Sequence, residues 1–369
     1  MAAVGFSDLP TEALDEIARR VGPLDNVTCS AVCKPWRRAL KTTRLRPLQH
    51  PNFPHQVELY GYNNTVKVSP IHYSISSTRS VVVLDDRDEG APPKRIIGSA
   101  YGWAVTVDKE HGLCLVDPLT GRQFPLPALA GKKAAKDLDL LGEDMFHKAA
   151  LAPGRRLGSY AVLLIHSGGH GLSFLAPGAK SWTTLRAPSW APGKYMDAVF
   201  HKGAFYTVGI DSELNAWVRD GSTAGLRARR ATVPRTERAW SALVNPMTTS
   251  DELMMVRQVS SLASGPPEYE VSRYDERGGR WLPVEDLGEA AVFVGGSCSV
   301  CVSTRGRGSS SSNARLPLKN YLYFARSCNW SSYRHPQEYR LPTATDRWGY
   351  GVYSISWFLP YVVPQFCHY

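Results

Sequence analysis

The sequence has 369 residues and a formal net charge of +10, from 43 Lys and Arg against 33 Asp and Glu. This length accommodates a small module followed by one large domain that buries its own core. The charge excess is mild, and the arginines do not alternate with aromatic residues as in a nucleic-acid-binding stripe, so nucleic-acid binding is disfavoured.

Apolar runs, the N-terminal sequence and the cysteines indicate the compartment in which the protein is expected. No uncharged apolar run approaches the roughly twenty residues that span a bilayer, so we expect no membrane span. The N-terminus lacks the basic start and apolar core of a secretory signal. Seven widely spread cysteines do not form a disulfide framework. We therefore expect a reduced, intracellular protein, in the nucleus and/or the cytoplasm.

Residues 6–46 predict three short helices. Pro10 stands where a first helical position needs no amide hydrogen, and Leu14 and Ile17 follow at helical spacing. A second helix is expected over 24–32, and a third begins at Lys34 and carries Trp36. Three helices of this length do not cover so many large apolar side chains by themselves. The pattern therefore predicts a partner surface.

The same stretch resembles the F-box, in its Leu9-Pro10 start, Ile17 and the late Val32-Cys33-x-x-Trp36-Arg37. The resemblance implies docking onto the Skp-family adaptor, and through it the cullin, of SCF (Skp–cullin–F-box) ubiquitin ligases. It implies that seven residues form the adaptor-facing or supporting surface: Leu9, Pro10, Leu14, Ile17, Val32, Cys33 and Trp36. The alternative is that these residues pack against one edge of the larger domain.

Beyond Leu48 helical periodicity gives way to short β-rich runs separated by Gly, Pro, Asp and Ser, apart from one short helix expected over 130–141. The runs predicted as strands are 81–84, 103–107, 113–116, 160–165, 205–208, 253–257 and 321–324. Such runs favour an all-β sandwich, barrel or propeller. A parallel α/β fold is disfavoured, because it requires a helix between successive strands.

A weak internal repeat narrows this choice. Three segments, 113–127, 172–185 and 269–284, each read as a strand, a Gly-containing turn and a second strand. In the last two, Trp182 and Trp281 follow the turn, where a large ring fills the space between stacked sheets. The spacing is near the length of kelch-type blades. We therefore expect a mainly all-β domain, a six- or seven-bladed kelch-like β-propeller, after the small all-α module.

Most of the chain resembles the plant KIB-type F-box proteins. The resemblance rests on residues 98–108, 115–121, 126–127, 146–149, 198–206, 251–256 and 292–300. It implies an F-box at 1–48, a propeller-like domain at 49–369 and a role in recruiting a protein substrate, which no motif identifies. A stretch rich in Ser, Arg and Gly at 303–316 is expected to be a flexible loop.

Candidate sites for chemistry are weak. Cys298 and Cys301 have the spacing of a metal or redox pair, but no second pair accompanies them, so we expect two buried strand cysteines. His166 and His170 flank a Gly-Gly turn, which favours a hairpin end over a metal site. The repeated Phe-His-Lys at 146–148 and 200–202 is interpreted as equivalent structural positions in two repeats. We predict no catalytic residue, cofactor or metal.

The sequence therefore predicts a non-catalytic substrate receptor of an SCF-type ubiquitin ligase. Two alternatives remain: an enzyme housed in the propeller channel, and a basic scaffold that binds RNA or chromatin. The second would use the arginine cluster that we interpret as solvated loops, Arg227, Arg229, Arg230, Arg235 and Arg238.

Overall fold

The structure is a computed structural model of the chain. It describes residues 9–20, 29–30, 32–43, 55–60, 65–70, 80–81, 95–108, 110–119, 121–129, 146–154, 159–220, 225–235, 237–246, 252–259, 269–304, 320–325, 330–334 and 352–358. None of the described helices is long and apolar enough to cross a membrane.

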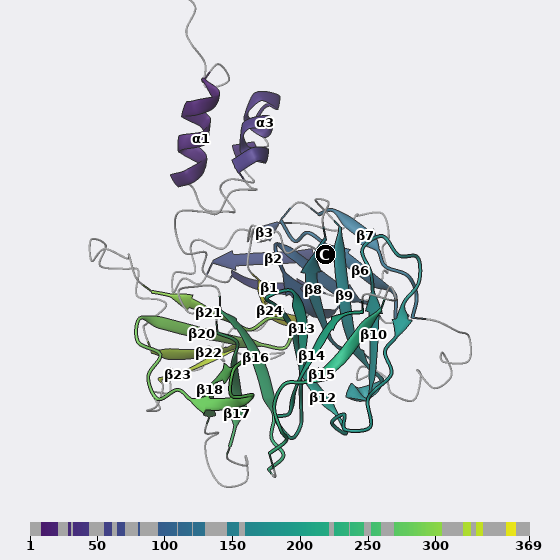
Figure 1. Cartoon of the computed structure of the whole chain (residues 1–369). Coiled ribbons are helices and arrows are strands. Elements are labelled where there is room, and N and C mark those ends of the chain that lie inside the picture. Colours follow the sequence, from purple (N-terminus) through teal and green to yellow (C-terminus); the bar gives the residue numbers. More distant parts are fainter. Residues whose placement is uncertain are drawn as a thin grey trace, which may run out of the picture.

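Two helices, α1 (Thr11–Arg20) and α3 (Lys34–Thr43), lie together to one side of the strands (Figure 1). α1 begins one residue after Pro10, and the amide of Leu14 donates to the Pro10 carbonyl at 3.1 Å. The third predicted helix is confirmed at Lys34. Of the second, Cys29 and Ser30 are the helical residues that the structure describes.

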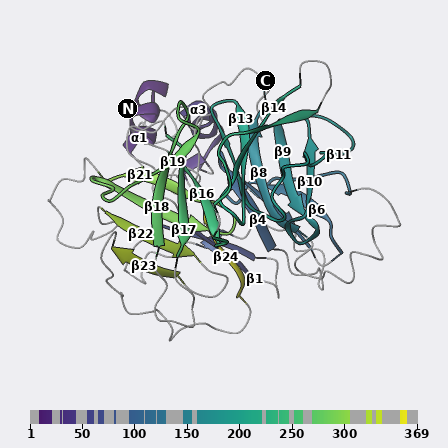
Figure 2. The same cartoon turned by 60° about the horizontal axis from the view of Figure 1, so that its bottom comes forward.

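The rest of the described chain is built of sheets whose neighbouring strands pair antiparallel, apart from two parallel pairings in an eight-stranded sheet (Figures 1 and 2). The first sheet runs in the order β24 (Val352–Phe358), β1 (His55–Tyr60), β2 (Thr65–Pro70), β3 (Ser80–Val81). The second contains β4 (Arg95–Ala100), β5 (Trp103–Val107), β6 (Leu113–Val116) and β7 (Gln123–Pro125). The third contains β8 (Phe146–Pro153), β9 (Tyr160–His166), β10 (Gly171–Leu175) and β11 (Thr183–Thr184), with a 3₁₀ turn at Ser167–Gly169.

A fourth sheet contains β12 (Tyr195–His201), β13 (Ala204–Gly209), β14 (Leu214–Arg219) and β15 (Leu226–Arg230). An eight-stranded sheet follows, with β16 (Ser241–Pro246), β17 (Met254–Gln258), β18 (Tyr269–Asp275) and β19 (Arg280–Pro283) in one half. Its other half holds β20 (Ala290–Gly295), β21 (Val300–Ser303), β22 (Tyr321–Ala325) and β23 (Trp330–Arg334). A short parallel pairing of β16 with β21 joins the halves.

The sheets stack around their first strands. β4 lies next to β8, β8 next to β12, and β12 next to β16. Apolar clusters fill the spaces between successive sheets, such as the one that joins Leu163 and Phe174 of one sheet to Phe205 and Trp217 of the next. The third and fourth sheets therefore bury both faces against their neighbours, which is the packing of a propeller.

The last strand closes the arrangement. β24 pairs antiparallel with β1, with Ser356 opposite Val57 and Phe358 opposite His55. The inner strand of the first sheet therefore comes from the far end of the sequence.

Four inner strands share a local irregularity. The ladder register shifts at Tyr353 in β24, at Ile97 in β4, at His147 in β8 and at Met196 in β12. Each shift is a β-bulge, which bends the strand and redirects the side chains that follow it. Gly98, just after the bulge in β4, lies so close to the next sheet that a Cβ there would collide with the Ala149 carbonyl oxygen.

The predicted β domain is confirmed in its strands. Runs 103–107 and 113–116 coincide with β5 and β6, and 160–165, 205–208, 253–257 and 321–324 match β9, β13, β17 and β22 closely. Of the run 81–84, residue 81 belongs to β3. The repeat segments 113–127, 172–185 and 269–284 are the outer hairpins β6–β7, β10–β11 and β18–β19. The helix expected at 130–141 and residues 305–316 of the expected loop lie outside the described residues.

Candidate functional site

The helical module is held together by a small apolar core. Leu14 of α1 and Trp36 of α3 are 2% and 7% exposed, and they pack against each other. Leu9, Ile17, Cys29 and Cys33 pack partly buried around this pair. The two buried side chains therefore support the module from within.

The remaining predicted adaptor residues reach the surface to different degrees. Pro10 is exposed, and Val32 leaves 64% of its surface in solvent. Leu9, Ile17 and Cys33 are partly exposed. Val32 lies in a turn, because its amide donates to the Cys29 carbonyl at 3.2 Å. A large apolar side chain exposed to this extent in a fixed turn is available to a partner.

The arginine beside Trp36 ties the segment before α3 to the helix. The Nε of Arg37 donates to the Ser30 carbonyl at 3.3 Å, and its amide donates to the Cys33 carbonyl at 3.0 Å. Ser30 is itself buried. The turn that carries Val32 is therefore fixed on both sides of the exposed side chain.

In the β domain a buried ion pair connects three successive inner strands. Lys148 Nζ of β8 lies 2.8 Å from Asp197 Oδ1 of β12, with side chains 5% and 6% exposed. The Ala198 amide donates to Oδ1 and the Leu243 amide of β16 donates to Oδ2, both at 2.8 Å. Lys148 and Asp197 each follow a bulge in their strand. The carboxylate therefore accepts hydrogen bonds from its own strand and from both neighbouring sheets.

A cavity of about 50 Å³ lies beside this ion pair. It is lined by β4, β8, β12 and β16 and by the segment before β21. This segment links distant sheets, since the Ser99 amide donates to the Ser297 carbonyl and the Asn245 amide to the Ser299 carbonyl, both at 3.0 Å. A cavity of this size, with Lys148, Asn245 and serine groups in a largely apolar lining, suits a few water molecules.

Burial shifts the pKa values of two groups near the ion pair, Cys298 in the cavity lining and His147 beside Lys148. Burial raises the pKa of the Cys298 thiol to about 11, although Lys148 and a hydrogen bond from Ser99 oppose the rise. Burial lowers the pKa of His147, whose Nε2 lies 2.8 Å from the Met196 carbonyl oxygen. A protonated thiol is a poor nucleophile, and the Asp197 carboxylate is already occupied. The arrangement serves to connect the sheets.

The prediction of two buried strand cysteines is confirmed in part, because Cys301 belongs to β21 whereas Cys298 lies in the segment before it. Cys298 and Cys301 are both buried, and burial also raises the pKa of Cys301 to about 11. Cys301 packs into the apolar cluster between the halves of the eight-stranded sheet. No group of three or more potential metal-ligating side chains occurs in the described part of the chain.

The prediction for His166 and His170 is also confirmed. His166 ends β9 and His170 follows the 3₁₀ turn. Both ring nitrogens of His166 have hydroxyl partners, with Nδ1 2.9 Å from Ser167 Oγ and Nε2 3.0 Å from Ser173 Oγ. Burial lowers the pKa of His166 to about 4, so the ring is neutral at physiological pH.

The interpretation of the repeated Phe-His-Lys was wrong in one respect. Phe146 begins the inner strand β8, whereas Phe200 stands near the end of β12, so the two copies do not occupy equivalent positions. The positions that correspond are those after the bulges in β4, β8 and β12, Gly98, Lys148 and Asp197. These residues share no chemistry, so comparing letters did not reveal them.

The prediction that the arginine cluster lies in loops was also wrong in part. Arg227, Arg229 and Arg230 belong to the outer strand β15. Arg230 Nε lies 2.6 Å from Glu213 Oε1, and its guanidinium stacks 5.0 Å from the centre of the Trp190 ring.

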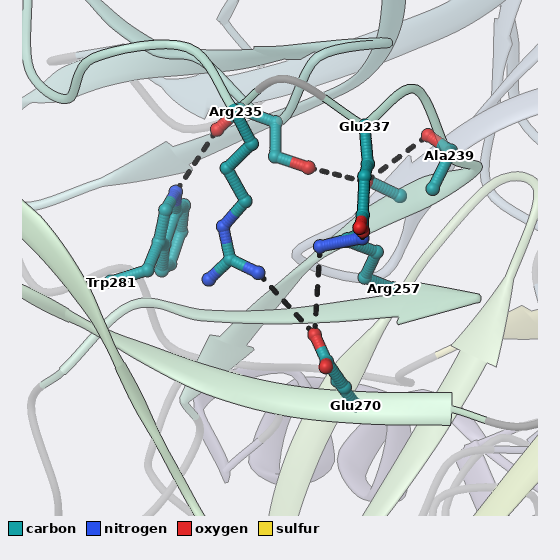
Figure 3. A network of polar contacts seen from close by, with 8 residues as sticks. Arg235, Glu237, Ala239, Arg257, Glu270 and Trp281 are labelled. Carbon is teal, nitrogen blue, oxygen red and sulfur yellow. Dashed lines mark hydrogen bonds and ion pairs between the residues drawn. The ribbon is translucent and has the colours of Figure 1, made fainter. Parts of the chain in front are cut away.

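The connection between β15 and β16, residues 231–240, is fixed by arginine contacts (Figure 3). Arg257 Nη2 lies 2.6 Å from Glu237 Oε2, and Arg235 Nη1 lies 3.3 Å from Glu270 Oε2. The Arg235 amide also donates to the Asp211 carbonyl at 2.7 Å. The connection is therefore held against both the fourth sheet and the eight-stranded sheet.

The fold and the helical pair define an F-box protein with a propeller-like β domain. The F-box domain model matches residues 6–48, and the KIB1-4 beta-propeller model matches residues 71–354. The chain therefore belongs to the KIB1-4 beta-propeller family, as its sequence predicts. No curated protein matches the sequence.

Solved structures are similar only at a distance. YCF48 from Cyanidioschyzon merolae is 13% identical, with a TM-score of 0.35 over 62% of this chain and 66% of that chain. The dihydro-heme d1 dehydrogenase NirN in complex with DHE is 12% identical, with a TM-score of 0.38 over 78% and 53%. The N-terminal domain of Nup159 is 10% identical, with a TM-score of 0.34 over 76% and 68%. At these values the similarities carry no functional argument.

Proposed function

We propose that the protein is a substrate receptor of an SCF-type ubiquitin ligase. The F-box would dock the Skp-family adaptor, and through it the cullin, while the β domain would hold a protein target for ubiquitination. The observation that carries the proposal is the union of an F-box with a separate β domain in one chain. In this mechanism the protein makes no bond itself. It raises the effective concentration of the target near the ubiquitin-loaded enzyme.

The packing of the helical module suggests which of the seven F-box residues support the helices and which would contact the adaptor. Leu14 and Trp36 would maintain the helix pair. Pro10 and Val32, with the exposed parts of Leu9, Ile17 and Cys33, would contact the adaptor. Apolar side chains on adjacent helices commonly fill a groove of a partner in this way.

We also propose that the β domain, residues 49–369, is a kelch-like propeller of six blades. The support is the sheet order: each of four sheets has four strands, and the eight-stranded sheet divides into two sets of four. The F-box would occupy residues 1–48. With these partners we place the protein in the nucleus and/or the cytoplasm.

Adaptor co-purification tests the proposal. Leu9→Ala with Pro10→Ala, and separately Val32→Glu, should abolish co-purification with a Skp-family adaptor, because they remove or charge the apolar contact surface. Lys34→Ala, an exposed change on α3, is the matched control and should leave binding unchanged.

The readout needs a check on folding. Circular dichroism and thermal unfolding should show a native β domain in the surface variants. Trp36→Ala should lose adaptor binding through loss of the helix pair itself. Wild-type binding by both Leu9→Ala/Pro10→Ala and Val32→Glu would overturn the assignment of this surface, and failure of the unaltered protein to bind any adaptor would overturn the function.

A further inference from the structure

The open outer edge of β15 differs from the other outer strands. β15 ends the fourth sheet, paired with β14 alone among the described strands. Natural proteins shorten such edges or place proline there, because an open edge accepts further strands. β11 has two residues, and β7 and β19 end at Pro125 and Pro283. Of the outer strands whose side chains the structure describes, β15 is the longest, and it contains no proline.

The ladder shows which backbone groups face outward. The Ala231 amide donates to the Leu214 carbonyl at 2.8 Å, and β14 pairs with β15 in the same register. Hydrogen-bonded and non-hydrogen-bonded pairs alternate along an antiparallel ladder. Arg227 and Arg229 therefore direct their amides and carbonyls toward β14, whereas those of Leu226 and Ala228 face the open edge.

The side chains of β15 divide between its two faces. Leu226 and Ala228 pack, partly buried, against the apolar cluster shared with the third sheet. Arg227 and Arg229 lie on the opposite face and are exposed. Neither has an ion-pair partner among the described residues. Arg229 and Glu276 both act electrostatically on Tyr206 and Tyr274. Glu276, however, pairs with Lys202 at 3.5 Å.

We propose that β15 binds an extended acidic segment of a target protein, which adds a further strand to the fourth sheet. The segment would alternate carboxylates with apolar residues. Its carboxylates would lie beside Arg227 and Arg229, and its apolar side chains beside Leu226 and Ala228. Opposite charges on paired strands attract, and the same arginines repel a second copy of this edge. Strand addition of this kind is a common mode of peptide recognition.

As a recruitment site for a target, the edge rests on the proposed function, but its binding chemistry can be tested separately. A phage-displayed library of random 12-residue peptides is selected on the full chain. The enriched peptides should be acidic at alternate positions and apolar between them. A fluorescein-labelled consensus peptide should then lose at least tenfold in affinity, by fluorescence polarisation, for Arg227→Glu with Arg229→Glu.

Matched controls separate this contact from general charge attraction and from misfolding. Lys180→Glu with Arg186→Glu makes the same charge change at exposed positions before and after β11, and it should reduce affinity less than threefold. Ala228→Pro removes an outward amide without removing a ladder bond to β14, and should abolish binding. Ala228→Ser, which keeps the amide, should bind as the unaltered protein does.

Adaptor co-purification distinguishes failure of this site from failure of the proposed function. All four variant proteins should still bind the adaptor. Selection of peptides without acidic residues, or equal binding by the Arg227/Arg229 and Lys180/Arg186 variants, would overturn the edge proposal. Salt-sensitive binding of a labelled RNA in place of any peptide would also overturn it. Loss of adaptor binding by the unaltered chain would overturn the ligase role instead.

Discussion

At the scale of single residues, the most consequential arrangement is the Lys148–Asp197 pair. A buried charge is costly unless it is paired and hydrogen-bonded. Asp197 meets both conditions, because it accepts from the Lys148 ammonium and from two backbone amides. The pair therefore connects strands that would otherwise share only apolar contacts.

Asp197→Asn should destabilise the β domain by about 3–5 kcal/mol, because it leaves the Lys148 charge buried without a counter-ion. Urea unfolding followed by tryptophan fluorescence measures the change. Lys202→Met, which breaks the exposed pair with Glu276, is the control and should cost less than about 1 kcal/mol. Equal effects of the two changes would contradict the importance given to burial.

At the scale of elements, two outer hairpins connect to the preceding sheet through a tryptophan. Trp182 Nε1 donates to the Pro127 carbonyl at 2.7 Å, and Trp281 Nε1 donates to the Ser212 carbonyl at 3.1 Å (Figure 3). Both rings also pack against the apolar cluster between the same two sheets. A tryptophan ring suits this boundary, because its apolar surface packs between the sheets while its Nε1 donates a hydrogen bond.

Trp281→Phe should lower the free energy of unfolding by about 1 kcal/mol or more, because it deletes this hydrogen bond and keeps most of the ring. Trp182→Phe should behave alike. Trp240→Phe is the control: its ring is among the more exposed large apolar side chains, and its change should be near zero. Thermal unfolding of the three variants makes the comparison, and a Trp240 effect as large as the other two would refute it.

Some of this architecture could be predicted from the sequence and some could not. Strands such as 103–107 and 113–116 were predictable because apolar β-branched runs end at turn residues. The hairpins ending at Trp182 and Trp281 were predictable because a large ring after a turn recurs. β15 was not, since its three arginines read as a solvated loop. An outer strand can carry exposed charge on one face without losing its ladder.

In the candidate site, too, some features could be predicted from the sequence and others could not. The F-box motif predicted seven residues for adaptor binding, but periodicity does not separate Leu14 and Trp36, which pack inward, from Val32, which does not. The Lys148–Asp197 pair was not predictable, because its partners lie on different sheets and are joined by tertiary packing alone. The bulges that align them produce no residue pattern.

At the scale of the whole molecule, closure of the β domain depends on β24. This strand completes the first sheet by pairing with β1. Without it, β1 would expose an open inner edge, and the first sheet would lose its contact with β4. An arrangement of stacked sheets removes its edges only when the first and last sheets meet.

A chain ending at residue 351 should lose this closure. We expect a lower unfolding temperature and faster limited proteolysis within residues 55–81, because β1–β3 lose their inner partner. A chain ending at residue 358 retains β24 and is the matched control. Equal protease resistance of the two chains would contradict the role assigned to this strand.

The pairing of β24 with β1 also has a consequence for biosynthesis. Roughly 300 residues separate the two strands, and at ~5–20 residues/s a ribosome needs on the order of tens of seconds to make them. During that interval the F-box helices have left the ribosome while the first sheet still lacks its inner strand. A transcript that stops early would yield the F-box joined to an unfinished β domain. The position of one strand thus makes synthesis of β24 a condition for a finished β domain.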